Sequence, residues 1–212
     1  MKEYLESARY IDSGHAAVVD FSRKNSSGKN KTERAVSLYY AVRDGIRYNP
    51  FLDFSREETF RASQCIAAGE GFCIGKAALL AACARADGIP ARVGFADVKN
   101  HLTTPALRER MGTDLFVYHG YAELLLGGKW LKATPAFNVE LCRRFRVKPL
   151  EFDGHEDSIF HPFDQEGRRH MEYLRDRGSH ADVPVAEIMQ AFREAYPVLY
   201  GLAGGAAKER FG

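Results

Sequence analysis

Long hydrophobic runs, an excess of one charge and a dense set of cysteines are all missing from this sequence of 212 residues. No stretch approaches the ~18 apolar residues that a helix needs to cross a bilayer. The formal net charge is only +2, which gives no general attraction to nucleic acid or to an anionic membrane. Residues 1–4 include an acid and begin no apolar run, so we expect no secretory signal. These absences predict a cytoplasmic protein with no nucleic-acid or membrane partner.

The four cysteines predict neither a disulfide scaffold nor a zinc site. They are too few to staple a chain of this length, and none of them forms a Cys-x-x-Cys pair. We therefore expect free thiols in a reducing compartment and no cofactor. Each cysteine needs its own explanation: Cys65, Cys73, Cys83 and Cys142.

Apolar residues recur at helical spacing in four segments, the first of which follows a polar loop at residues 22–31. Capping residues, glycines and prolines mark where these helices begin and end. The predicted helices run from the expected cap Thr32 to about Gly45, from the capping-box pair Ser55 and Glu58 to about Ile66, from Cys73 to Gly88, and from Pro184 to about Tyr196.

Alternating apolar residues predict strands at 92–96 and 116–126. Gly127 and Gly128 predict a hairpin into a partner strand that ends near Ala136. The other expectations are a polar connection at 98–114 with one helical turn near Leu107, one or two strands at 139–153 with Arg143–Arg146 on a solvated strand edge, an unassigned polar segment at 154–182, and a frayed end from Gly201.

Cys73 follows Gly71 closely and begins the alanine-rich helix. A thiol at a helix start lies near unpaired backbone N–H groups and the positive end of the helix dipole, and both favour the thiolate. The same N–H groups can receive an oxyanion during acyl transfer. The other three cysteines lack this setting, because Cys83 lies nearly three turns into the helix, Cys65 late in the preceding helix, and Cys142 before an Arg-rich segment.

His119 lies in the middle of the predicted strand 116–126. If the hairpin loop has two residues, Leu126 pairs with Lys129, and continuation of this register places Thr134 and Asn138 diagonal to His119 on the same face. This holds only if the strand survives Pro135. A polar group there could fix the tautomer of a catalytic imidazole.

Three blocks resemble the transglutaminase-like superfamily, whose core is related to papain. Gly71-Phe72-Cys73-Ile74-Gly75-Lys76 with Asp87-Gly88-Ile89-Pro90-Ala91-Arg92 resembles the cysteine block, His119-Gly120-Tyr121-Ala122-Glu123 the histidine block, and Trp130-Leu131-Lys132-Ala133-Thr134-Pro135 the third block. The resemblance covers about residues 33–138. It implies an α+β fold in which a central helix with an N-terminal cysteine packs on an antiparallel sheet. Residues 1–212 would then form one domain, with 139–212 as an extension packed on the core.

Carried over to this chain, the resemblance implies that Cys73 is the nucleophile and His119 the general base and acid. The family has an aspartate where this sequence has Thr134. Threonine can accept a hydrogen bond from the imidazole but supplies no negative charge. Asn138 and Asp153 are the alternative orienting groups. For the second oxyanion donor, Gln64 and Tyr48 stay open.

The expected activity is that of a cysteine hydrolase or acyl-transferase that acts on an amide bond of a peptide or protein through a thioester. The alternative is a decayed module that binds a peptide or protein partner, which the loss of the aspartate would explain. A metal site is a third reading, on the residues Asp153, His155, Asp157, His161 and Asp164. Their spacing matches no standard ligand set, so a solvated polar loop is the preferred interpretation.

Overall fold

The computed structural model describes residues 1–101, 103, 105–160, 164 and 166–196 of the chain. The segment from Gly201, predicted to be frayed, lies outside these residues, as does His161. Among the helices of the described part, none combines the length and the apolar character that a membrane span requires.

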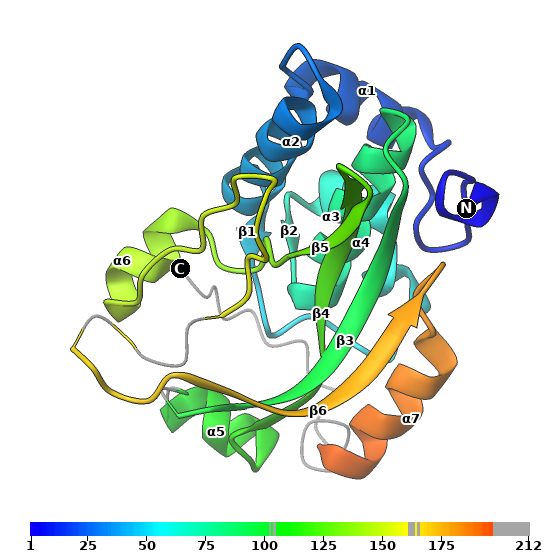
Figure 1. The fold of residues 1–212 in the computed structure, drawn as a ribbon. Coiled ribbons are helices and arrows are strands. Elements are labelled where there is room, and N and C mark those ends of the chain that lie inside the picture. The colour runs from blue at the N-terminus through cyan, green and yellow to red at the C-terminus, as the bar shows by residue number, and fades with distance from the viewer. Residues whose placement is uncertain (102, 104, 161–163, 165, 197–212) are drawn as a thin grey trace.

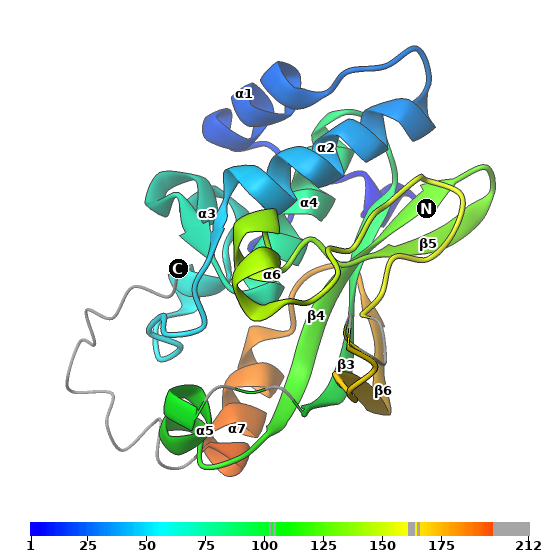
Figure 2. The same ribbon diagram turned by 90° about the vertical axis from the view of Figure 1, so that its left-hand side faces the viewer.

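The helices gather mainly on one side of the main sheet, and α4 lies between the sheet and the N-terminal helices (Figures 1 and 2). Two short 3-10 helices accompany them. The bounds are η1 Lys2–Tyr4, α1 Ala16–Asn25, α2 Lys31–Gly45, η2 Glu57–Phe60, α3 Ala62–Ala68, α4 Cys73–Ala86, α5 Pro105–Met111, α6 Val139–Phe145 and α7 Val185–Ala195.

Two sheets complete the described fold. The small one is a parallel pair, and the main one is antiparallel with the strand order β5-β4-β3-β6. Their strands are β1 Arg47–Tyr48, β2 Glu70–Gly71, β3 Ala91–Asn100, β4 Leu115–Leu126, β5 Lys129–Ala133 and β6 Met171–His180. The fold is therefore α+β with a central helix on an antiparallel sheet, as predicted.

The hairpin between β4 and β5 has the predicted two-residue loop and register. Leu126 pairs with Lys129, and the ladder continues to Ala122 opposite Ala133. Gly127 and Gly128 have φ values of 56° and 82°, and positive φ at both central residues is what a type I′ turn requires. The strand ends at Ala133 rather than near Ala136, because Pro135 cannot donate to the ladder.

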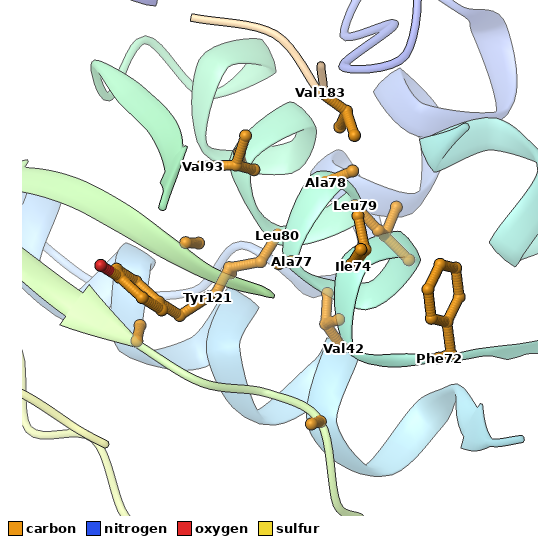
Figure 3. Packing of buried hydrophobic residues seen from close by; sticks show 14 of the residues in the cluster. Val42, Phe72, Ile74, Ala77, Ala78, Leu79, Leu80, Val93, Tyr121 and Val183 are labelled. Atoms are coloured by element: carbon orange, nitrogen blue, oxygen red, sulfur yellow. The ribbon is translucent and has the colours of Figure 1, made fainter. Parts of the chain in front are cut away.

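Helix α4 forms the centre of the hydrophobic core, and its small residues are buried all round. Figure 3 shows Ala77, Ala78 and Leu80 of this helix among side chains from α2, the sheet and the segment before α7. The C-terminal half also supplies core residues, including Phe152 and Ile188. Gly88, with φ of 74°, ends the helix in the left-handed conformation expected of a C′ glycine.

The start of α2 and the two segments beside it differ from the predictions. Asn30, not Thr32, caps α2, because its carboxamide accepts the Glu33 N–H at 2.9 Å. Helix α1 extends into the predicted polar loop, where the buried Ser22 donates to the Cys83 carbonyl at 2.9 Å. The predicted helix from Ser55 is divided into η2 and α3, because the backbone at Arg61 is extended.

The strands predicted at 139–153 are wrong, since this segment begins with helix α6. Leu141 is buried and Phe145 packs against the core, and this i,i+4 spacing fits one face of a helix. The basic cluster Arg143–Arg146 therefore lies at a helix end and not on a strand edge. In the preceding connection, β3 continues to Asn100, and α5 replaces the single turn expected near Leu107.

Candidate active site

Cys73 is the first residue of α4, and backbone N–H groups from two elements approach its sulfur. Phe72 occupies the N-cap position and its side chain makes no capping hydrogen bond. The Sγ atom of Cys73 accepts hydrogen bonds from the backbone of Cys73, Ile74 and Gly120, and these lower its pKa. The last donor comes from β4, so the sulfur lies where the helix start meets the sheet.

Gly120 allows this close approach between helix and strand. A Cβ atom at this position would lie 2.9 Å from the Cα atom of Ile74 and 3.2 Å from its Cγ1 atom. Contacts as short as the first would force the helix start away from β4. The close packing of the helix start on the strand therefore explains the glycine after His119, whatever the role of the imidazole.

Burial opposes the backbone donors and has the larger effect on the thiol. It raises the pKa of Cys73 to about 11, although the three backbone hydrogen bonds act in the opposite direction. The backbone donors at the helix start therefore favour the thiolate, as predicted, but burial outweighs them. Removal of the sulfur from water penalises the anion more than these dipoles stabilise it.

His119 lies on β4 immediately after a distortion of the strand. Tyr118 has a positive φ of 54°, and the pairing of β4 with β3 shifts register opposite this point. The His119 side chain is 3% exposed and its ring packs on Phe160 with centroids 4.9 Å apart. Burial lowers its pKa to about 3, so the imidazole is neutral at physiological pH.

Two buried polar atoms, one on His119 and one on Thr134, have no hydrogen-bond partner among the described residues. The Nε2 atom of His119 is buried and makes no hydrogen bond with any residue that the structure describes. The Oγ1 atom of Thr134 is likewise buried and makes no hydrogen bond with a described residue. The ladder of β4 and β5 ends at Ala133, so the strand on which the predicted diagonal placement of Thr134 and His119 depends does not continue to Thr134. The two side chains are not hydrogen-bonded to each other.

The backbone of Thr134 is held firmly where the family has its aspartate. Its N–H donates to the Ser158 carbonyl at 3.0 Å, and its carbonyl accepts from the Tyr39 hydroxyl at 3.2 Å. Thr134 is 1% exposed. Two hydrogen bonds thus fix the backbone at this position, while the side chain there carries no charge.

The two alternative orienting residues make other contacts. Asn138 precedes α6, and its Oδ1 atom accepts the Tyr48 N–H at 3.5 Å, which fixes β1. The exposed Asp153 accepts the N–H groups of His155 and Glu156 at 2.8 and 3.0 Å, as in a turn. Neither makes a hydrogen bond to His119.

A cleft with two lobes surrounds the imidazole. The lobe that we call the thiol-side pocket contains Cys73 and has a volume of about 490 Å³, part of it open to solvent. The imidazole-side pocket lacks Cys73 and has a volume of about 590 Å³ on the same measure. Four residues line both pockets: Tyr48, Leu107, Phe116 and His119. Cys73 and His119 therefore face the same cavity.

Two tyrosines lie beside the thiol. Tyr48 is held near Cys73 because β1 pairs with β2, which places Tyr48 opposite Gly71. Burial and the neighbouring Cys73 raise the pKa of the Tyr48 phenol, and its hydroxyl makes no hydrogen bond with a described residue. Tyr196 follows α7, and its hydroxyl accepts the Val117 N–H at 2.6 Å. The sequence indicated only an apolar helix face for Tyr196, because nothing local links it to Cys73.

Gln64, the other candidate oxyanion donor, is exposed on α3 and lines neither pocket. The three remaining cysteines are buried, and burial raises the pKa of Cys65 to about 12 and that of Cys142 to about 11. Burial also raises the pKa of Cys83. Of the four, Cys73 shares a pocket of the cleft with His119.

Lys76 is a fully buried lysine one turn along α4, and the sequence did not reveal its burial. Its Nζ atom donates to the carbonyls of Arg43 and Ile46 at 2.8 and 2.6 Å, at the end of α2. Burial lowers its pKa to about 7. These hydrogen bonds tie helix α4 to the segment that leads into Tyr48.

The polar segment after Asp153 supplies no metal site among the described residues. Asp157 accepts the Lys132 N–H at 2.8 Å. Asp164 pairs with Arg168 at 2.7 Å. These carboxylates act as local hydrogen-bond acceptors, and His161 lies outside the described part.

Comparisons with known proteins agree with this architecture. The model of the family described as the transglutaminase-like superfamily matches residues 20–135. A protein from Cytophaga hutchinsonii, whose crystal structure is described as that of a "putative cysteine protease", is similar with a TM-score of 0.53 and 18% sequence identity. The similarity covers 86% of this chain but 47% of the other, so the chain spans about half the length of that protein. No curated protein matches the chain significantly.

Proposed function

Because the chain belongs to the transglutaminase-like superfamily, we propose that it is a cysteine-dependent hydrolase or acyl-transferase. It would act on amide bonds of a peptide or protein, either peptide or isopeptide bonds, through a thioester at Cys73. The observation that carries this proposal is the shared pocket in which the sulfur, its backbone N–H donors and His119 meet. No metal or cofactor enters the reaction as proposed.

The resting pair is a thiol and a neutral imidazole, because burial raises the pKa of Cys73 and lowers that of His119. Attack on the amide carbonyl therefore requires general-base catalysis in the same step. The sulfur forms a bond to the carbonyl carbon while its proton passes to His119. The negative charge that develops moves to the carbonyl oxygen.

Backbone N–H groups at the start of α4 are placed to receive that oxygen, and we assign the Tyr48 hydroxyl as the second donor. The hydroxyl lies at the border of both pockets and is not engaged by another described residue. Preorganised donors of this kind stabilise the oxyanion more strongly in a buried site than in water.

Collapse of the tetrahedral intermediate completes the first half of the reaction. The C–N bond breaks and the proton on His119 passes to the leaving amine, which leaves an acyl group on Cys73 as a thioester. In hydrolysis, water then attacks the thioester with His119 as the base, and in transfer an amine attacks in its place. The products are a carboxylic acid or a new amide, and the thiol regains its proton.

Thr134 and the unpaired Nε2 atom of His119 favour one alternative, a decayed module that binds a peptide or protein partner. Without a carboxylate, nothing stabilises the imidazolium that general-base catalysis produces. In this case Cys73 would retain its place in the cleft but would not form a thioester through His119.

Acylation of Cys73 by the p-nitrophenyl ester of N-acetyl-phenylalanine separates the two functions. For the enzyme, His119→Gln should slow nitrophenol release by about 10³-fold, since general acid–base catalysis contributes about 10²–10⁴-fold. His155→Gln is the matched control, because His155 is exposed and its backbone N–H alone is bonded. Equal rates in all three proteins would establish the decayed module.

A further inference from the structure

The lining of the cleft carries information about the substrate beyond the reaction type. Among the residues that the structure describes, no lysine, arginine, aspartate or glutamate lines either pocket. The groups that can titrate there are Cys73, the tyrosines and two histidines, and His119 is held neutral by burial.

The thiol-side pocket has a wall of connected aromatic rings. Phe54 contacts Phe72 and Phe192 with ring centroids 4.7 and 5.5 Å apart. Phe192 in turn contacts Tyr196 at 5.3 Å. Met111 adds a further apolar side chain. A bulky apolar group would fit against this wall, whereas a charged group would lose its hydration without gaining a partner.

Aliphatic as well as aromatic side chains line the imidazole-side pocket. Leu141, Phe145 and Val147 line it, together with Phe137, whose ring lies 4.9 Å from that of Tyr48. Asn100 and His170 also line this pocket and supply polar groups. The Asn100 side chain carries no charge. None of the described residues that line this pocket has an acidic side chain that would attract the ammonium group of a lysine acceptor.

Reaction chemistry assigns a different half of the substrate to each pocket. The acyl carbon must bond to Sγ of Cys73, which lines the thiol-side pocket alone. The leaving nitrogen must receive a proton from His119, which lies between the two pockets. The acyl residue therefore occupies the thiol-side pocket, and the residue that carries the leaving amine extends into the imidazole-side pocket.

We propose that the substrate is an amide bond between two bulky, uncharged, apolar residues, the acyl residue against Phe54, Phe72 and Phe192 and the amine-side residue against Phe137, Leu141 and Phe145. This inference rests on the proposed function and narrows it. None of the described residues that line the imidazole-side pocket is acidic, so this pocket does not attract the ammonium group of a protein lysine. We therefore expect water to be the acceptor.

Internally quenched peptides test the substrate class. A peptide with Phe on the acyl side and Leu on the amine side is compared with peptides that carry Asp or Lys at either position. We expect kcat/KM to fall by at least about 10²-fold for each charged replacement, because an unpaired buried charge costs several kcal/mol. Equal cleavage of charged and apolar peptides would overturn the inference but leave the proposed function intact. Cleavage of none of them, together with no ester acylation of Cys73, would reject the proposed function itself.

Two variants test the assignment of the pockets. Phe192→Leu should reduce the preference for Phe over Ala on the acyl side and leave the preference on the amine side unchanged, and Leu141→Ala should do the reverse. Leu is chosen at position 192 because it keeps most of the buried volume. If Phe192→Leu unfolds, Met111→Ala replaces it as the variant of the thiol-side pocket. Thermal unfolding verifies each fold. A variant that alters the preference on the opposite side would overturn the assignment.

Discussion

The sulfur of Cys73 and the imidazole of His119 belong to one cleft but have opposite surroundings. Three backbone N–H groups approach the sulfur, whereas the buried Nε2 atom of His119 has no hydrogen-bond partner in the described part of the chain. Backbone donors follow from the fold, so they survive changes of side chain. A side-chain partner of an imidazole depends instead on the residue at one position, and a single substitution can remove it.

The largest expected effect is a loss of stability at acidic pH, because His119 is uncharged in the folded chain. Its pKa is lowered from 6.5 to about 3 in the folded chain, so the unfolded chain binds the proton first as the pH falls. Stability is then unaffected above about pH 6.5 and decreases as the pH falls toward 3, by up to about 5 kcal/mol from this group. Urea unfolding at a series of pH values should show this slope.

His119→Gln separates this contribution from that of the carboxylates, which also respond to acid. The difference in unfolding free energy between the variant and the wild type should change with pH below about 6.5. A constant difference would mean that His119 has the same pKa in the folded and unfolded chain, which would contradict its burial as a neutral imidazole.

Tyr48→Phe examines the donor that completes the surroundings of the sulfur. Loss of the hydroxyl should slow acylation by the p-nitrophenyl ester by about 10²-fold, as removal of an oxyanion donor does elsewhere. Alkylation of Cys73 by iodoacetamide should not change, because that reaction develops no oxyanion. Tyr40→Phe is the control, since its hydroxyl bonds to Glu151 at 2.7 Å. Equal slowing of acylation and alkylation would indicate a packing role for Tyr48.

Gly120→Ala tests the close contact that brings a strand N–H to the sulfur. The new Cβ would lie 2.9 Å from the Ile74 Cα, and overpacking of this kind costs about 1–3 kcal/mol. Urea unfolding should show this loss. Gly45→Ala is the matched control, because a Cβ there meets nothing within 4 Å. Equal stabilities for the two variants would contradict the contact.

Thr134→Asp should give the imidazole of His119 a charged partner. The imidazole and the sulfur would then both have groups that stabilise their charged forms. A nearby carboxylate raises the pKa of an imidazole and stabilises its cation. A shift of one unit in the coupled pair would raise iodoacetamide labelling of Cys73 at neutral pH by about tenfold. Thr134→Asn has nearly the same shape without the charge and should label as slowly as the wild type. Faster labelling of both variants would exclude the electrostatic explanation.

The sequence predicts those features whose causes are local. The central helix was predictable from Gly88 and its small residues, and the hairpin register from the Gly127–Gly128 pair. Helix α6 was not, because the basic run Arg143–Arg146 obscures the inward spacing of Leu141 and Phe145. Local residues favour a strand there, and packing on the core decides for a helix.

The electrostatic state of the site depends on burial, which local sequence does not reveal. The helix start at Cys73 was predictable, yet the net direction of its pKa depends on how strands and α7 cover the sulfur. Tyr196 reaches the thiol-side pocket from the far end of the described chain, and the amine of Lys76 is buried against the end of α2. The roles of Thr134 and Asn138 stay predictions.

Peptide mapping of the acyl-enzyme tests the central claim most directly. The Phe–Leu peptide is mixed with the chain, the reaction is quenched with acid at short times, and the proteolytic fragments are weighed. We predict an acyl group on the fragment that contains Cys73, its absence in Cys73→Ala, and strongly reduced formation in His119→Gln. An acyl group on another residue, or equal amounts with and without His119, would contradict the account.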